Sequence, residues 1–559
     1  MRRKTVASGE GGYILFVALG FAVLLGLGSV LAVTGTIAEL QSAGRQLRDK
    51  RAFFLADGGA NLCLHELRNR LQRDLAGQLR ILADMQSVGN YVSNNDPAGF
   101  LATYAYEAGT SLGDAFQRVN ASEARLPLSY TAAGAPGPYT CTLAVLSRTA
   151  PVNRGTAMSP VYLFRYHYAI DGSATDGEIA RRVNLQGTFS VQVEMENFAR
   201  YALFTNQQRD AAGSPIWFTN RTNFSGPVHT NGEFNFALNP GGLFTGPVTS
   251  VSSTATYYNG GAPVQLNADR NGDRDVPTFE AGFERGVPNI PMPTTTTAER
   301  QREAALGLPG GSGIPAHPTG VYLGSSGGAM TGGIYIKGDA AMTLGAGATT
   351  ATYTITQGGS TTTVTVNQAA NQTILQVGSA PPTVYSGVPN GMIFVDGGTL
   401  SSLSGTVQRD SRVTVATTGD IQITNNITYQ DYTPGSVPSA EGTTNVLGIL
   451  SWSGNVRIGA TAPNDINVHA TVMTPNGEFR VDNYTTGPFR GTATILGGVI
   501  ENTYGAFGTV GTIKTGYLRT FVYDTRMGRG VAPPFFPTTG KMVITLPGVN
   551  DRPNWQQTS

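Results

Sequence analysis

The chain begins with a long apolar segment. No charged residue occurs from Gly11 to Ala38, and the run from Tyr13 to Val33 is almost wholly apolar. At about 1.5 Å per residue, a helix over that run would be roughly 30 Å long, which matches the hydrocarbon core of a bilayer. The pattern predicts a transmembrane helix over residues 13–36, preceded by a leader over residues 1–12.

The leader indicates how this helix would be oriented. It starts with MRRK (Met1–Lys4), and basic residues before a first helix favour a cytoplasmic N-terminus with the bulk of the chain extracytoplasmic. A secretory signal peptide shares the basic start, but its apolar region normally has only about 7–15 residues. The sequence therefore favours a single-pass membrane protein at the cell surface, with a cleaved signal peptide as the alternative.

Helical periodicity continues beyond the predicted anchor. Apolar residues recur mostly at intervals of three, four or seven, with Arg, Lys, Gln and Asp between them. These apolar residues are Ile37, Leu40, Leu47, Phe54, Leu62, Leu67, Leu71, Leu75, Leu79 and Leu82. The spacing predicts a helical stalk within residues 37–126.

The period then changes to two. Tyr139–Ser147, Val161–Ile170 and Arg181–Glu196 alternate apolar and polar side chains, as half-buried antiparallel strands do. We expect a small antiparallel sheet domain over residues 127–197.

The remaining chain shows imperfect repeats. FSGPVHTNG (Phe224–Gly232) recurs as FTGPVTSVS (Phe244–Ser252), displaced by twenty residues. Repeats of this length, with a turn after each short strand, are typical of a β-solenoid (β-helix). We expect such a domain over residues 198–540, with a large β-sandwich as the alternative, and a tail over residues 541–559. The fold class is thus mainly β with a long N-terminal α-helix.

One segment within this region reads as an insertion. Residues 351–366, ATYTITQGGSTTTVTV, contain two alternating runs around Gln357–Ser360, which predicts a hairpin. One face is rich in threonine, and we expect the hairpin to project from the body as a contact surface.

Composition excludes two classes of protein. Charged residues make up 13% of the 559, the formal net charge is +1, and there are 24 Phe and 22 Tyr. Disordered chains usually combine high net charge with few aromatic residues, so we expect a folded chain. The near-zero charge gives no electrostatic basis for binding nucleic acid.

The two cysteines limit the redox chemistry. Cys63 and Cys141 are too few for a disulfide framework or a Cys-rich zinc site. We expect two unpaired thiols packed as small apolar side chains. One disulfide, formed in an oxidising compartment, is the alternative.

Two N-terminal segments resemble type IV pilins. The basic leader, Gly12, the aromatic Tyr13 and the apolar helix resemble a class III (prepilin) leader. RAFFLADGGANLCLHEL (Arg51–Leu67) is similar to the AF-x-A-E-A segment of minor pilins of the PilX kind, with Asp57 at the acidic position. The resemblance implies cleavage by prepilin peptidase between Gly12 and Tyr13, and association with other pilin subunits.

The resemblance has one departure. Major pilins carry a glutamate five residues into the mature chain, and that position is Val17 here. The difference favours a minor pilin or a pilin-like accessory subunit over a major one.

Small residues offer a packing surface on the predicted anchor. Ala18, Ala22 and Gly26 lie on one helical face at a spacing of four, and Gly28 and Ala32 repeat that spacing beside them. Such rows let helices approach closely in a membrane or in a filament core. Gly and Ala are also common in any transmembrane helix, so the row is compatible with a plain anchor.

The C-terminal region resembles a second family. GPVHTNGEF (Gly226–Phe234), LGGVIENTYGAFG (Leu496–Gly508) and PPFFPTTG (Pro533–Gly540) are similar to segments of large, functionally uncharacterised bacterial proteins with pilin-type leaders. This resemblance covers roughly residues 200–540 and implies architecture only.

An acidic segment is the candidate metal site. DRNGDRDVPTFE, read as a twelve-residue calcium loop, places oxygen-bearing side chains at positions one, three, five, seven and twelve. These residues are Asp269, Asn271, Asp273, Asp275 and Glu280. Arg274 occupies the position of the usual turn glycine, so a solvated acidic turn is the alternative.

No residue pattern indicates catalysis. The five histidines have no metal-ligand spacing, and no phosphate loop, G-x-S-x-G or CxxC motif occurs. We expect a non-enzymatic, pilus-associated surface protein whose β domain contacts a surface glycan or another cell-surface ligand, without a cofactor other than calcium. The alternatives are a membrane-anchored polysaccharide-processing enzyme and a structural or adhesive envelope protein.

Overall fold

The computed structural model describes most of the chain. The described residues are 10–70, 117–118, 123–130, 139–147, 152–153, 161–237, 242–258, 262–267, 277–433, 444–509, 511–549 and 554–558. They are mainly β, with one long N-terminal helix. Two compact units divide them: the first draws on residues 1–154, 162–193 and 542–559, and the second on residues 155–161 and 194–541.

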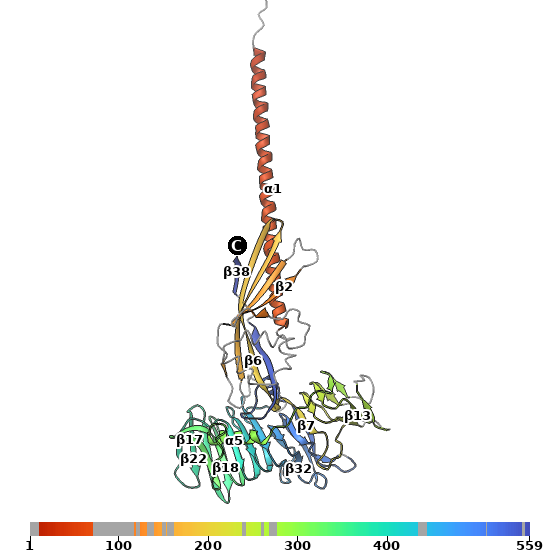
Figure 1. Ribbon diagram of the computed structural model, residues 1–559, viewed down its shortest axis with the longest axis vertical. Coiled ribbons are helices and arrows are strands. Elements are labelled where there is room, and N and C mark those ends of the chain that lie inside the picture. Colours follow the sequence, from red (N-terminus) through yellow and green to blue (C-terminus); the bar gives the residue numbers. More distant parts are fainter. Residues whose placement is uncertain are drawn as a thin grey trace, which may run out of the picture. The chain divides into compact units, whose positions relative to one another are not determined.

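The helix α1 (Glu10–Arg70) has 61 residues and contains no proline, so nothing in its sequence interrupts the backbone hydrogen bonds. Its first half carries no other element beside it in Figure 1. Its second half buries one face, formed by Ala52, Ala56, Ala60, Cys63, Leu64 and Leu67. These intervals of one, three and four residues are those of a single helical stripe. The rest of the predicted stalk, residues 71–116, lies outside the described residues.

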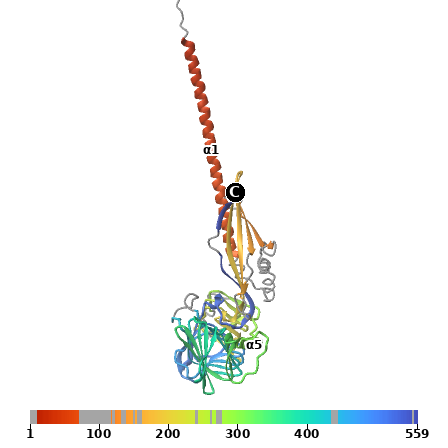
Figure 2. The ribbon, with the colours of Figure 1, turned by 90° about the vertical axis from the view of Figure 1, so that its left-hand side faces the viewer.

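An antiparallel sheet receives this stripe, as the period of two predicted (Figure 2). Its strands follow the order β1-β2-β3-β5-β6-β37, with β4 paired to β5 and β38 paired to β6. They are β1 (Gln117–Arg118), β2 (Glu123–Tyr130), β3 (Tyr139–Ser147), β4 (Val152–Asn153), β5 (Val161–Asp176), β6 (Ile179–Asn197), β37 (Thr538–Val549) and β38 (Asn554–Thr558). β1 and the start of β2 fall within the region that we expected to be helical.

The C-terminal residues belong to this first unit. Residues 541–559, expected to form a tail, contribute part of β37 and all of β38 to the sheet. The second unit is therefore inserted between two neighbouring strands, because the chain leaves the sheet through β6 and returns through β37. Residues near this entry and exit are joined by hydrogen bonds: Phe198 N donates to Pro537 O at 3.1 Å, and Asn197 Nδ2 donates to Phe536 O at 3.1 Å.

The helix and the sheet approach each other closely. A Cβ atom at Gly172 would lie 2.5 Å from the carbonyl oxygen of Ala56, so β5 needs a glycine where α1 crosses it. Beside this contact, Cys63 of α1 and Cys141 of β3 form a disulfide. Our expectation of two unpaired thiols was wrong, because helix packing brings the two side chains together across 78 residues of sequence.

The second unit contains a ladder of parallel strands (Figure 1). One apolar position repeats in every strand of this ladder, and all of its residues are buried: Ile334, Ile393, Val415, Ile449, Val472, Val499, Leu203, Val228, Val248 and Phe283. The corresponding strands are β18 (Ala329–Lys337), β24 (Met392–Asp396), β26 (Arg412–Thr417), β28 (Val446–Ser451), β31 (Thr471–Thr474), β34 (Val499–Thr503), β7 (Leu203–Gln207), β9 (Val228–Thr230), β12 (Val248–Ser250) and β16 (Phe283–Arg285). Val228 pairs with Val248 in this register, which confirms the twenty-residue repeat.

The order of this ladder is not the order of the sequence. The chain first forms β7, β9, β12 and β16, which lie in this order at one end of the ladder. It then forms β18 at the other end, and each later strand of the ladder pairs with the one before it until β34 pairs with β7. The first strand of the unit therefore lies between β34 and β9. At this junction Asn206 Nδ2 donates to Asn502 Oδ1 at 2.9 Å.

A second set of parallel strands runs beside the first. β19 pairs with β25, β25 with β27, and β27 with both β29 and β30; β32 follows β29, and β33 and β36 follow β30. Their bounds are β19 (Ala340–Ala346), β25 (Leu400–Val407), β27 (Ile421–Tyr429), β29 (Val456–Ile458), β30 (Asn467–His469), β32 (Phe479–Val481), β33 (Phe489–Leu496), β35 (Gly508–Thr509), which pairs with β36, and β36 (Thr515–Val522).

The predicted hairpin is present, but it does not project. β20 (Thr350–Gln357) and β21 (Ser360–Asn367) turn at Gly358 and Gly359, which both have positive φ. They belong to an antiparallel series from β19 to β23 that includes β22 (Gln372–Val377) and β23 (Thr383–Ser386). The expected projection is wrong, because the apolar side of the hairpin, including Tyr353 and Val364, is buried in the main core.

The first turns of the unit have an aromatic core. β8 (Trp217–Phe218), β10 (Asn235–Ala237), β13 (Ala255–Tyr258) and β14 (Val264–Leu266) form one sheet, and β11 (Leu243–Phe244) pairs with β15 (Thr278–Phe279). Buried rings from these strands pack edge to face or tilted, as aromatic pairs prefer. These rings are those of Phe218, Phe236, Phe244 and Phe279.

Among the described residues, the second unit also contains one more strand and three helices. β17 (Gly320–Ser326) pairs antiparallel with β18 at one end of the ladder. The helix α5 (Thr295–Leu306) packs on β17, β18 and β24. Two single-turn helices, η2 (Phe198–Arg200) and η3 (Met527–Arg529), contact each other.

The disulfide gives a prediction for the first unit. Replacing both cysteines (Cys63→Ala with Cys141→Ala) removes a link that closes a loop of about 78 residues. We expect the free energy of unfolding of this unit to fall by about 2–4 kcal/mol. Thermal unfolding of the two proteins, each with and without a reducing agent, measures this. Reduction should lower the melting temperature of the wild type and leave that of the double variant unchanged; two free thiols in the oxidised wild type would contradict the pairing.

Candidate functional site: the two halves of the N-terminal helix

The first half of α1 exposes large apolar side chains on every side. Tyr13, Phe16 and Leu25 are 76%, 79% and 72% exposed, and five consecutive residues from Tyr13 to Val17 are all exposed. A window of this helix has a mean hydropathy of 2.6, which makes it long and apolar enough to cross a membrane. A helix that is apolar all round needs an apolar environment.

The second half of α1 is held by polar as well as apolar contacts. Asp57, the acidic position in the pilin resemblance, accepts a hydrogen bond from Trp555 Nε1 at 3.0 Å. The Trp555 ring also packs edge-on against Phe53, with centroids 5.8 Å apart. On the next strand, Arg181 of β6 forms an ion pair with Asp49. Residues from the two ends of the sequence thus meet on one face of the helix.

The predicted assembly residues lie in the exposed half. Ala18, Ala22, Gly26, Gly28 and Ala32 are all exposed, and nothing lies within 4 Å of a Cβ atom built on either glycine. They form two neighbouring rows along the helix, and no element among the described residues covers them. The predicted processing site begins the same half: Gly12 is helical and Tyr13 is exposed.

The candidate calcium loop is mostly outside the described residues. Asp269, Asn271, Asp273 and Asp275 lie there, while Glu280 is exposed in the turn after β15. Within the described part of the chain, no group of three or more His, Cys, Asp and Glu side chains is arranged to hold a metal ion. The calcium site stays a prediction.

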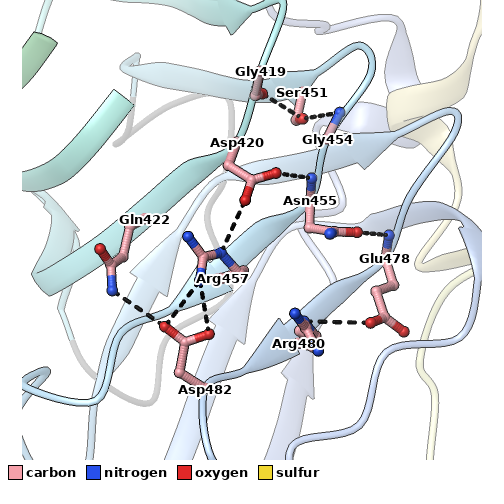
Figure 3. A network of polar contacts seen from close by, with 10 residues as sticks. All are labelled: Gly419, Asp420, Gln422, Ser451, Gly454, Asn455, Arg457, Glu478, Arg480 and Asp482. Atoms are coloured by element: carbon pink, nitrogen blue, oxygen red, sulfur yellow. Dashed lines mark hydrogen bonds and ion pairs between the residues drawn. The ribbon is translucent and has the colours of Figure 1, made fainter. Parts of the chain in front are cut away.

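Ionised side chains cross three strands of the second parallel set (Figure 3). Arg457 of β29 lies between two carboxylates: its Nε is 3.2 Å from Asp420 Oδ2, and its Nη1 is 3.2 Å from Asp482 Oδ1. Gln422 Nε2 also donates to Asp482 Oδ2 at 3.2 Å. Both carboxylates are thus engaged by the guanidinium, which links neighbouring strands.

Sequence reasoning missed this network, although a signal was present. Gln422, Arg457 and Arg480 pair with one another in register across β27, β29 and β32. The segments NVRIG and EFRV place an arginine between two apolar residues, and aligning them would have stacked the two arginines. Arg480 Nε has its own partner, Glu478 Oε1, at 3.3 Å (Figure 3).

Buried titratable groups inside the ladder have structural partners. His469 Nδ1 accepts the Tyr429 backbone N–H at 3.0 Å, and burial lowers the pKa of His469 to about 4, so the ring stays neutral. Glu501 of β34 accepts backbone N–H bonds from Phe479 at 2.9 Å and Gly505 at 3.1 Å. Burial raises the pKa of Glu501 to about 8 despite these bonds, so its carboxyl is protonated at neutral pH.

Comparison with known proteins gives one match. Residues 162–253, from β5 to just beyond β12, match a domain of unknown function (DUF4900). No curated protein and no solved structure matches the chain. The matched segment spans the passage from the antiparallel sheet into the first parallel strands.

Glu501 gives a prediction about pH. The folded chain holds this proton up to about pH 8, whereas the ordinary pKa of the group is 4.5, so the free energy of unfolding should fall as pH rises between these values. Glu501→Gln resembles the protonated acid and cannot ionise. We expect it to flatten the pH dependence of the melting temperature and to exceed the wild type at alkaline pH. Glu299→Gln, at an exposed position of α5, is the control and should leave the pH dependence unchanged. If the melting temperatures of the wild type and Glu501→Gln depend equally on pH, the titration of Glu501 does not contribute to stability.

Proposed function

We propose that the protein is a membrane-anchored, pilin-like surface protein that displays a large β domain outside the cytoplasmic membrane. The observation that carries the proposal is the division of α1 into two halves. One half exposes apolar side chains all round, and the other buries a single stripe against an antiparallel sheet. One helix thereby serves both as an anchor and as part of a folded domain.

Two features support a pilin-like subunit over a plain anchor: the basic leader and Gly12 resemble a prepilin processing site, and the helix continues unbroken into its folded domain. The exposed small residues from Ala18 to Ala32 would offer such a subunit a surface for close helix packing. Val17, in place of a glutamate, favours a minor or accessory subunit. Its partners would be prepilin peptidase, the membrane and other pilin subunits.

Orientation follows from charge and from redox chemistry. The MRRK leader favours a cytoplasmic N-terminus, and the Cys63–Cys141 disulfide suits an oxidising compartment on the opposite side. The bulk of the chain would then be extracytoplasmic.

The displayed domain is best interpreted as a β-solenoid. Stacked parallel strands with one buried aliphatic position in every turn are what such a fold requires, whereas a β-sandwich is built from antiparallel sheets. This domain is inserted in the sequence between β6 and β37, after the anchor.

N-terminal sequencing of the protein from cells that contain prepilin peptidase tests the proposal. We expect a mature chain that starts at Tyr13, because the resemblance places cleavage after Gly12. Gly12→Val should prevent this cleavage, because prepilin leaders are cleaved after a glycine and the variant has a branched side chain at that position. Gly35→Val, within α1 and far from the leader, is the matched control and should be processed normally. A wild-type chain that retains Met1, or one that starts near Ala32, would contradict the proposal.

A further inference from the structure

A cleft of about 650 Å³ lies in the second unit, between α5, the loop that follows it and the exit segment before β37. Its volume falls within the range of about 300–1,000 Å³ that is usual for small-molecule sites. We infer that this cleft binds a neutral oligosaccharide. The cleft itself is a property of the second unit, and only the extracytoplasmic source of the ligand rests on the proposed function.

The polar lining of the cleft is uncharged or self-compensated. Three threonines, Thr296, Thr297 and Thr331, contribute hydroxyl groups that both donate and accept hydrogen bonds. A fourth, Thr538, also lines the cleft, but its hydroxyl donates to Met195 Sδ at 3.7 Å. The only ionised side chains in the lining are Arg300 and Glu303, which form an ion pair at 3.3 Å. An anionic ligand would therefore meet a carboxylate together with the guanidinium, and the local charge is balanced.

The carboxylate is committed to holding the wall of the cleft. Glu303 accepts backbone N–H bonds from Gly311 at 2.9 Å and from Gly313 at 3.1 Å. Burial opposes ionisation, but these two bonds and Arg300 keep the pKa of Glu303 below its ordinary value. The acid stays ionised and saturated, which suits a binding site and not proton transfer. One saturated carboxylate also gives a metal ion too few ligands.

Arg300 is held in place while keeping donors for a ligand. A Cβ atom at Gly310 would lie only 2.2 Å from Arg300 Nη1, so the glycine lets the guanidinium approach the loop closely. Its side chain is 40% exposed. A planar group with several N–H donors can bond two neighbouring hydroxyl oxygens at once, and neighbouring hydroxyls are what a sugar ring presents.

The opposite wall is strained. Phe535 has a φ of 57°, a conformation that bulky residues rarely adopt; the other positive-φ residues besides glycine in the described chain are Asn or Asp. Two buried hydrogen bonds hold Phe535 in this conformation. Gln301 Nε2 donates to Phe535 O at 2.8 Å, and Trp452 Nε1 donates to Gln301 Oε1 at 2.8 Å. Strain that the surrounding structure maintains tends to occur at ligand sites.

The remaining lining is apolar. Leu308, Pro309 and Pro537 supply it, and they suit the C–H faces of sugar rings. A wholly apolar ligand would displace water from the exposed threonine hydroxyls and from Arg300 without replacing its hydrogen bonds, which costs binding free energy. A neutral, hydroxylated ligand with apolar ring faces matches the entire lining.

Isothermal titration of the full-length protein tests the inference. The protein is kept in micelles of a sugar-free detergent, and the probes are the neutral tetrasaccharides of β-linked glucose, N-acetylglucosamine and mannose, with tetragalacturonate as the acidic comparison. We expect at least one neutral probe to bind, and to bind more tightly than the acidic one. Binding of no neutral probe, or preferential binding of the acidic one, would overturn the inference.

Variants locate the binding. Thr331→Trp places a large ring in the cleft from an exposed position of β18, and Arg300→Ala removes the exposed donors. Each should weaken binding at least about tenfold, which is roughly 1.4 kcal/mol. Thr343→Trp, at an exposed position of β19 outside the cleft, is the matched control. If Arg300→Ala lowers the melting temperature, Thr331→Trp alone decides, and wild-type affinity in that variant would assign the binding to another place.

These results are separable from those for the proposed function. If the protein binds a neutral oligosaccharide but is not cleaved after Gly12, the binding inference holds and the pilin-like function is contradicted. If the mature chain starts at Tyr13 but no oligosaccharide binds, the pilin-like function holds and the binding inference is contradicted.

Discussion

The second unit depends on one continuous column of buried aliphatic side chains. The column joins two parts of the chain that are far apart in sequence, because Val499 pairs with Leu203 where β34 meets β7. Each fully buried side chain of this type contributes about 1.5–3 kcal/mol relative to exposure. Without this junction β34 and β7 would both be open strand edges, each presenting unpaired backbone groups to other chains. The antiparallel strands from β19 to β23 contribute further buried side chains to the same core.

In the first unit, one helix is both an exposed apolar segment and part of a folded domain. An apolar helix and a folded domain are usually separate parts joined by a linker, but here α1 changes environment within a continuous run of hydrogen bonds. The change is made by side chains alone. Large apolar residues surround the first half, while small ones, Ala52, Ala56 and Ala60, let the second half approach β5 closely enough to require Gly172. The disulfide then fixes the register of helix and sheet.

The polar groups divide into those that hold the structure and those that remain available to a ligand. Arg457 forms ion pairs with two carboxylates, and His469 and Glu501 are neutral and bonded to backbone groups. The burial of His469 and Glu501 costs free energy that hydrogen bonding offsets, and the ion pairs of Arg457 link neighbouring strands, so all three groups hold the structure. The cleft beside α5 differs, because exposed threonines and the 40% exposed Arg300 line it while Gln301 and Trp452 hold its wall. That contrast is why binding is assigned there and not at the charged network.

The sequence by itself determined the local elements: the apolar helix from its length, the antiparallel strands from their period of two, and the repeat of Phe224–Gly232 from similarity at twenty residues. Such patterns report on neighbours within a few residues or one repeat. Tertiary structure alone decided that β7 pairs with β34, that Cys63 meets Cys141, that residues beyond 541 return to the first sheet, and that the Thr-rich hairpin lies on the core. The reason is physical: these contacts depend on which buried faces pack together, and a strand's alternation shows that it has a buried face without showing which distant strand covers it.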